Sequence, residues 1–386
     1  MTGIAPRRWR GLLRWMDYHG LALYFFDQVV EMQQSNLLPA EIRSEFERRL
    51  DENTARTRSM IAESIAIQRE LQKANLWYAL LKGASLTPSS TPRPELRSQF
   101  DLDFLVADED LEETHRILLK LGYRLYAVQG RHWEFKRNER PAMGLKGLYR
   151  DTDSWRVELH GEPTGPKSSG VLDRLEWREI GGFAMPTLSP VDLFVGQGLH
   201  ACKHVCMQFC RAAYLVEFRR HVLFRFGDSE FWAAVERRVN GNPQACLKLG
   251  TVIALAERVM GGFAPQALRR WTVGTLSPTI QLWIEMYGSR SVFESFPGTK
   301  LYLLLEEALQ ERGVTARRSV RRSIIPDCLP PLMFKGNPGE GVNVWLERYR
   351  VQFGLLLGRL YFHFVEGIRF AWEFRRWRRR LSQVTR

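Results

Sequence analysis

The sequence predicts an α+β fold, in which a core with a small mixed sheet and helices is flanked by N- and C-terminal helical regions. Apolar residues recur at helical spacings from Trp9 to about Asn75. Short strand-like segments follow between Trp77 and Pro186, with one helical segment among them. From Ser189 onward the pattern is helical again. Strands interleaved with a helix indicate an α+β domain of roughly 110 residues.

The N-terminal region is expected to end in one long helix. Leu21, Phe25 and Val29 recur at a spacing that places them on one helix face, and charged side chains fill the outer faces of the segment that follows. No proline interrupts residues 41–74. We therefore expect an uninterrupted helix that ends just before the first strand.

The middle region has the alternation that is typical of strands. Strands are predicted at residues 77–82, 101–106, 123–128, 132–137, 155–160 and 181–186. Between the second and third of these lies one helix, with Asp108 as its expected N-cap and Gly122 as its C-terminal stop.

The C-terminal half is predicted to be helical around a linker. Ser189 and Pro190 form a good helix start, because serine caps and proline suits the first helical position. Helices are expected at residues 190–220, in one or two pieces, and at 231–239, 243–260, 300–312 and 342 to about 381. We divide the chain into an N-terminal helical region (1–75), an α+β core (76–187), a helical domain (188–322), a Pro/Gly-rich linker (323–341) and a basic aromatic C-terminal helix (342–386).

Composition limits the compartment and the partners. Five cysteines in 386 residues are too few for a disulfide framework, and three of them fall in one helical-looking segment, which indicates a reducing, cytosolic compartment. The apolar run at 351–372 is broken by charged residues and a histidine, so a membrane span is not expected. The net charge of +13 favours anionic partners: nucleotides, nucleic acid or an acidic membrane surface.

Two aspartates interrupt an apolar strand. Asp101 and Asp103 are one residue apart and therefore share a strand face, while Leu102 and Phe104 point to the opposite face. The pair is either a salt-bridged structural pair or a site for a divalent cation, because burying unneutralised carboxylates is costly. Glu158 stands in the same way between Val157 and Leu159 in a later strand. Three carboxylates on adjacent strands can hold Mg²⁺ or Mn²⁺, and two such ions can stabilise a phosphoryl displacement.

A glycine turn lies upstream of the aspartates. The sequence LLKGAS predicts a strand that runs into Gly83 and then a turn or a helix start. A glycine at that position lets the backbone approach phosphates, whose oxygens the exposed N–H groups can bind. Lys82 or Arg97 could offer positive charge to a triphosphate.

As an ordered set, these residues resemble a known family. The series LLKGASL, ELRSQFDLDFLV, LGYRL, RVELHGEP and LSPVDLFVGQGLHACKH is similar to the bacterial nucleotidyltransferase family proteins of the DNA polymerase β-like superfamily, over roughly residues 71–220. The resemblance implies a polymerase β-like core and metal-dependent nucleotidyl transfer. It further implies metal binding by Asp101 and Asp103, with Glu158 as third ligand or base, and places Gly83 under the nucleotide phosphates.

The resemblance extends to two further nucleotide-binding candidates and includes two departures. Arg97 matches an arginine that such proteins often carry. The superfamily's usual Gly-Ser pair is here Gly83-Ala84, and Ser85 follows one place late. The interval from Gly83 to Asp101 is long for the superfamily but similar to that of the closer family. Ser85 is therefore a nucleotide-binding candidate with an altered spacing.

Several histidines are weighed as site residues. His200 and His204 are four residues apart on one helix face, but Cys202, Cys206 and Cys210 are expected on the opposite face, so one helix cannot direct both sets at a single zinc ion. The histidines are better explained as core or site-lining residues, and Lys203 or His204 is a candidate for contact with the nucleotide. His160 shares a strand face with Glu158, where it either tunes the metal site or bonds a neighbouring carboxylate. His132 carries no stronger signal.

The last helix alternates aromatic residues and arginines in FHFVEGIRFAWEFRRWRRR. Its aromatic stripe could stack on single-stranded bases, anchor the helix at an anionic membrane surface, or pack on the protein while the arginines face water.

The function predicted is Mg-dependent transfer of a nucleoside monophosphate from a nucleoside triphosphate, with ATP as the expected donor, to an acceptor hydroxyl with release of pyrophosphate. A protein, a small molecule, a glycan precursor or an RNA end could be the acceptor, and sequence-specific DNA binding is not expected. The alternative is a non-catalytic scaffold that binds a partner protein, or the inner face of the membrane, through the basic C-terminal helix.

Overall fold

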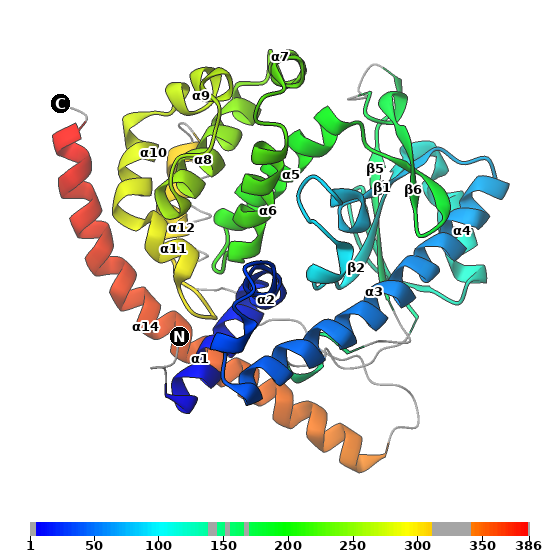
Figure 1. Cartoon of the computed structure of the whole chain (residues 1–386), viewed down its shortest axis with the longest axis horizontal. Coiled ribbons are helices and arrows are strands. Elements are labelled where there is room, and N and C mark those ends of the chain that lie inside the picture. Colours follow the sequence, from blue (N-terminus) through cyan, green and yellow to red (C-terminus); the bar gives the residue numbers. More distant parts are fainter. Residues whose placement is uncertain (1–4, 138–144, 151–154, 166–169, 311–340, 385–386) are drawn as a thin grey trace. The chain divides into compact units, whose positions relative to one another are not determined.

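The computed structural model describes residues 5–137, 145–150, 155–165, 170–310 and 341–384 (Figure 1). The predicted linker up to residue 340, Cys328 and the arginines between 317 and 322 lie outside these residues. The chain forms two compact units and passes between them within α5 (Pro190–Val205), within α6 (Ala212–Phe224) and again after Asn240.

The first unit is built on a mixed sheet whose strands have the order β3-β4-β5-β2-β1-β7-β6 in the described residues. The strands are β1 (Tyr78–Leu81), β2 (Asp101–Ala107), β3 (Arg124–Gln129), β4 (His132–Lys136), β5 (Arg156–Glu162), β6 (Glu176–Ile180) and β7 (Phe183–Thr187). The central strands β2 and β5 are parallel, and β1 and β4 flank them in antiparallel orientation. The predicted α+β class is thus confirmed.

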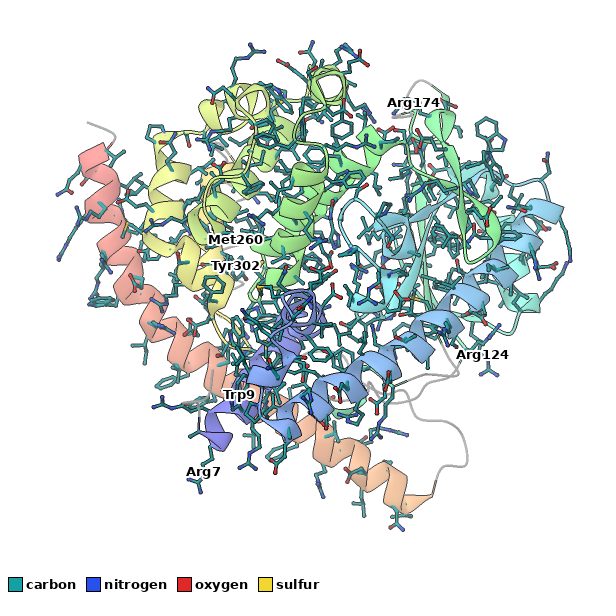
Figure 2. The ribbon with its side chains drawn as sticks, in the orientation of Figure 1. Arg7, Trp9, Arg124, Arg174, Met260 and Tyr302 are labelled. Atoms are coloured by element: carbon teal, nitrogen blue, oxygen red, sulfur yellow. The ribbon has the colours of Figure 1, made fainter. Side chains whose placement is uncertain are left out.

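Helices cover one face of this sheet. The long helix α3 (Ala40–Lys73) and the shorter α4 (Leu111–Lys120) pack their apolar sides on the strands. Their contacts form a buried core that includes Ile67, Leu118 and, from the strands, Phe104 and Leu159. Figure 2 shows the side chains that fill the layer between α3 and the strands. In β2 and β5 the alternation therefore turns Leu102, Phe104, Val157 and Leu159 toward the helices and the residues between them to the opposite face.

The N-terminal helices form a second core in the same unit. Helices α1 (Pro6–His19) and α2 (Ala22–Glu31) pack with the first half of α3, and Trp9, labelled in Figure 2, is buried among them. Helix α7 (Ser229–Val239) also belongs to this unit. The predicted uninterrupted helix before the first strand is confirmed as α3.

The second unit is helical. Its helices are α8 (Pro243–Met260), α9 (Gln266–Trp271), α10 (Pro278–Trp283), α11 (Ser289–Phe293), α12 (Tyr302–Leu309) and α14 (Val342–Val384). A π-helical turn at Ile284–Gly288 joins α10 to α11. None of the described helices is long and apolar enough to cross a membrane.

Three local predictions need correction. Asp108 does not cap α4, because its carboxylate pairs with Arg131 and a 3₁₀ turn, Asp108–Asp110, precedes the helix. The strand β6 was not predicted, since EWREI carries charges at three of its five positions. Cys210 lies beyond the end of α5, so it does not share a helix with Cys202, and the four described cysteines are free thiols. In contrast, the predicted start of α5 is confirmed, because Ser189 Oγ accepts from the Asp192 N–H at 3.2 Å.

Candidate active site

The three predicted carboxylates lie on neighbouring strands. In the parallel pair of β2 and β5, Asp103 stands opposite Glu158 and Asp101 stands opposite Arg156. Leu102, the residue between the two aspartates, belongs to the apolar core on the helix-covered face. The carboxylates consequently share the other face of the sheet, as the alternation of the sequence indicates.

Lys82 supplies a positive charge to this group. Its Nζ lies 2.7 Å from Asp103 Oδ1, and Asp103 is buried. The backbone of Lys82 has φ +53° and ψ −153°, a conformation that is otherwise almost confined to glycine. The hydroxyl of Ser85, which is itself buried, donates to the Lys82 carbonyl at 2.6 Å. Ser85 therefore supports the strained turn, and its contact with a nucleotide stays a prediction.

Gly83 begins a short 3₁₀ turn, Gly83–Leu86, directly after β1 and Lys82. Its φ is +57°, and a Cβ at this position would clash with the side-chain amide of Gln99. With the Gln99 oxygen directed at the turn, it accepts from the Gly83 N–H at 3.1 Å and from Arg97 Nη1 at 2.9 Å. The predicted glycine turn is confirmed, and one of its N–H groups is paired with a neighbouring side chain.

Arg97 is held by a buried acid that the sequence did not indicate. Arg97 Nε donates to both Glu217 oxygens, at 3.2 and 3.3 Å. Tyr24 also donates to Glu217 from its hydroxyl, at 3.0 Å. This network holds the Arg97 guanidinium close enough to the carboxylates that its charge offsets a small part of the rise in the pKa of Asp101, which burial causes.

The two aspartates divide their charge unequally. Burial, and then the charges of Asp103 and Glu158, raise the pKa of Asp101 to about 6. Burial also opposes ionisation of Asp103, but the hydrogen bond from His160 and the charge of Lys82 outweigh it and lower the pKa of Asp103 to about 2. Burial, together with repulsion within the group, thus promotes protonation of Asp101, which is the behaviour expected of crowded buried carboxylates that a cation would relieve.

Two histidines complete this face of the sheet. His160 Nε2 lies 3.0 Å from Asp103 Oδ1, so the second of its two predicted roles, bonding a neighbouring carboxylate, is observed. His132 Nε2 lies 3.0 Å from Glu158 Oε2. We did not predict a role for His132. The signal was available in the alternation of HWEFK, which places His132 and Glu134 on one strand face.

The remaining candidates lie in the second unit. Lys203 and His204 are in the C-terminal half of α5. The rings of His200 and His204 have centroids 4.5 Å apart, and both contact the Tyr214 ring. The predicted shared helix face is therefore observed, and a contact of Lys203 or His204 with a nucleotide stays a prediction.

Comparison with known proteins identifies the family. The model of a family described as uncharacterised nucleotidyltransferases matches residues 5–261. The chain belongs to this family. The matched residues contain the whole sheet of this nucleotidyltransferase family member and the carboxylates on it. No curated protein matches the chain.

Solved structures of other proteins are similar over about half of the chain. The solution structure of the antibiotic-resistance factor ANT(2″)-Ia is 12% identical and covers 48% of this chain and 98% of that chain, with a TM-score of 0.31. The crystal structure of ANT(2″)-Ia in complex with adenylyl-2″-tobramycin is 12% identical and covers 47% and 97%, with a TM-score of 0.34. An antigenic nucleotidyltransferase-like protein from Paracoccidioides brasiliensis is 16% identical and covers 50% and 92%, with a TM-score of 0.31.

Three carboxylates lie on one face of two adjacent strands, and carboxylate oxygens are the ligands that Mg²⁺ and Mn²⁺ prefer. Among the described residues, the group whose ligand atoms lie within 4.8 Å of one another is His132, Glu158 and His160, so binding of a cation by the two aspartates stays a prediction. The Lys82 ammonium lies against Asp103 and partly neutralises the group. A cation at this position would have to compete with, or displace, that ammonium.

Proposed function

We propose that this family member transfers a nucleoside monophosphate from a nucleoside triphosphate, expected to be ATP, to an acceptor hydroxyl, with release of pyrophosphate. The observation that carries the proposal is the placement of Asp101, Asp103 and Glu158 on one face of two adjacent strands, next to the strand that runs into the glycine turn at Gly83. This arrangement supports a divalent cation and a triphosphate at one site. The family match supports the reaction class.

Each residue has a proposed role. Asp101 and Asp103 hold Mg²⁺ or Mn²⁺, which when bound neutralises the phosphate oxygens and the charge that develops on them. Glu158 is the third ligand or the base that accepts the proton of the attacking hydroxyl. Lys82 and Arg97 offer donors to the anionic phosphates, and the Gly83 turn lets the chain approach them closely. Positioning and electrostatic stabilisation supply most of the rate.

The proposed acceptor is a protein, a small molecule, a glycan precursor or an RNA end, and we do not expect sequence-specific DNA binding.

Calorimetric titration tests this proposal. Nucleoside triphosphates with Mg²⁺ are titrated into wild type, into the double variant Asp101→Asn/Asp103→Asn, and into the control Asp51→Asn, whose carboxylate is exposed on α3. We expect metal-dependent binding by wild type and the control, and none by the double variant. Equal binding by all three proteins, or none by wild type, would contradict the proposed site and favour the non-catalytic scaffold.

We also propose peripheral contact with an anionic membrane, because one face of α14 is apolar and exposed. Leu360, Tyr361 and Phe364 are each about two-thirds exposed, at 68%, 71% and 67%. Other exposed apolar side chains of this helix are Trp345, Leu346, Tyr349, Phe353, Leu357, Ile368 and Trp372. The opposite side is packed on the second unit, where Tyr287 donates to the Glu373 carbonyl at 3.3 Å.

The positive charge of α14 favours an anionic surface as the partner of its exposed apolar face. Five arginines between 375 and 380 follow the apolar face, and two copies of such a basic helix would repel each other. An amphipathic helix that carries aromatic side chains and arginines is typical of binding at anionic lipid surfaces. Contact between α14 and such a surface therefore explains both features.

Sedimentation with vesicles tests the contact in the full chain. We expect wild type to sediment with vesicles that contain phosphatidylserine and not with neutral vesicles. The triple variant Phe353→Ser/Leu357→Ser/Phe364→Ser should lose this binding, while Trp177→Ser, which changes an exposed tryptophan on β6, should keep it. Unchanged sedimentation of the triple variant would contradict the proposal. Salt-sensitive binding of RNA in place of vesicles would assign the helix to nucleic acid.

A further inference from the structure

A second ligand cluster lies on the open face of the sheet, at the edge of the carboxylate group. His132 of β4 and His160 of β5 are direct cross-strand partners, and Glu158 lies two residues before His160. His132, Glu158 and His160 each offer one ligand atom within 4.8 Å of the others. Glu158 Oε2 is 3.0 Å from His132 Nε2 and 3.9 Å from His160 Nε2. The imidazole centroids are 4.9 Å apart.

We propose that His132, Glu158 and His160 form a site for a first-row transition metal ion. The site binds Zn²⁺ more tightly than Mn²⁺ and does not hold Mg²⁺. Imidazole nitrogen suits Zn²⁺ and its neighbours in the series, whereas Mg²⁺ requires oxygen ligands. Two histidines and one glutamate form a donor set of the kind found in zinc sites that keep a position open. The remaining position is available to water or to an oxygen of a bound ligand.

The strands already place the ligand atoms close to metal-binding geometry. Each histidine is held on a paired strand, so binding requires small side-chain movements and no backbone change. Both histidines are partly exposed, at 36% and 31% of their side chains, which gives an ion access from solvent. On binding, each Nε2 gives its lone pair to the ion, and the ring proton is carried on Nδ1.

This histidine site differs in its ligands from the aspartate pair, but it contacts Asp103 through His160 and shares Glu158 with the carboxylate group. His160 Nε2 is also 3.0 Å from Asp103 Oδ1, so an ion at the new site would exchange this hydrogen bond for a metal bond. Glu158 would then ligate the transition metal and not a second Mg²⁺. This part deepens the proposed function and rests on it, whereas binding of the metal alone does not.

Titration with Co²⁺, whose visible absorption reports its ligands, tests the site without nucleotide. We expect wild type to bind one equivalent at this site, with an absorption band that Zn²⁺ abolishes and that excess Mg²⁺ leaves unchanged. His132→Ala should weaken binding at least tenfold and remove the band. His132→Gln should do the same, and its circular dichroism and thermal unfolding serve to check that the chain remains folded.

Two control variants identify the histidines responsible. His115→Gln changes a histidine that packs against Phe135 on the helix-covered face, and it should bind Co²⁺ as wild type does. His200→Ala/His204→Ala removes the other neighbouring pair of histidines, which are four residues apart on α5, and should also leave the band intact. Loss of the band in that variant with retention in His132→Ala would overturn the proposal, as would the absence of a saturable band in wild type.

The Asp101→Asn/Asp103→Asn variant separates this proposal from the proposed function. We expect it to bind Co²⁺ through the histidines while failing to bind nucleoside triphosphate with Mg²⁺. Nucleotide binding that survives in this variant would contradict the aspartate site and leave the histidine site standing. Loss of the Co²⁺ band in the two His132 variants, with retention in the His115 and His200/His204 controls and in the aspartate variant, confirms the new site irrespective of the nucleotide result.

Discussion

Lys82 Nζ lies 2.7 Å from Asp103 Oδ1, and the backbone of Lys82 has a positive φ, which residues other than glycine rarely adopt. The backbone strain and the ion pair occur at the same residue, because Lys82 joins the end of β1 to the turn at Gly83 and its side chain reaches Asp103 from there. Charge of Asp103 and, to a smaller extent, of Asp101 and Glu158 raises the pKa of Lys82 despite the opposing effect of its burial. The ammonium is therefore charged and neutralises part of the acidic group.

Substitution of Lys82 should separate the ion pair from the backbone strain. Lys82→Ala removes the cation and keeps the strain, so we expect it to lower the free energy of unfolding by about 3 kcal/mol, mainly because Asp103 loses a buried partner. Lys82→Gly removes both and should be less destabilising than Lys82→Ala by about 1 kcal/mol. Urea unfolding of the two variants measures the difference. Equal free energies would show that the Lys82 backbone is not strained.

Because the pKa of Asp101 is raised in the folded state, its ionisation is expected to lower the free energy of unfolding as pH rises. The folded state holds the Asp101 proton more tightly than the unfolded state does, so stability falls as pH rises from about 4 to about 6 and the cost is complete above that range. Asp101→Asn removes this cost. Without added metal we therefore expect the variant to be more stable than wild type by about 1–2 kcal/mol near pH 8, and equal to it near pH 4.

Thermal unfolding across this pH range measures whether Asp101→Asn raises or lowers the stability, and Asp103→Asn is the matched variant. Lys82 and His160 lower the pKa of Asp103 against the effect of burial, so its charge stabilises the folded state above the normal pKa range of aspartate. Asp103→Asn should thus destabilise where Asp101→Asn stabilises. The same sign for both variants would contradict the unequal division of charge.

A side chain at Gly83 should be unfavourable both because φ is positive and because its Cβ would clash with Gln99. Gly83 and Gly130 have nearly equal φ values, +57° and +59°, but a Cβ at Gly130 meets no atom within 4 Å, whereas a Cβ at Gly83 would clash with Gln99. We expect Gly130→Ala to cost about 1 kcal/mol and Gly83→Ala at least twice as much.

Chemical denaturation of the two glycine variants provides the comparison. The double variant Gly83→Ala/Gln99→Ala removes the clash but not the positive φ, so its cost should be lower than the sum of the two single changes. Additive costs would show that Gln99 does not occupy the space beside Gly83.

The strands and the carboxylate face were predictable because both depend on local alternation. Asp101, Asp103 and Glu158 each stand between apolar residues, which fixes their face once the strand is recognised. The pairing of β4 with β5 is a long-range property, so the alternation of HWEFK indicates the strand face of His132 but not its contact with Glu158. Strand β6 was missed because its side chains are mostly charged, so the alternation of buried and exposed residues is absent from EWREI. Similarly, the partners of Arg97 come from residues 99 and 217, and no sequence spacing indicates such a contact.

The Arg97–Glu217 pair allows structural and functional roles to be distinguished. Arg97→Ala leaves the buried Glu217 carboxylate without its cationic partner, and we expect it to destabilise the fold by about 3 kcal/mol. Glu217→Gln removes the charge but keeps a group that can accept from the Tyr24 hydroxyl. The double variant should therefore regain most of the lost stability, which a double-mutant cycle of urea unfolding measures. If Arg97 also binds the triphosphate, nucleotide affinity measured by calorimetry stays low in the double variant although stability returns. Recovery of both quantities would make Arg97 a structural residue only, since its guanidinium would then serve Glu217 and not the phosphates.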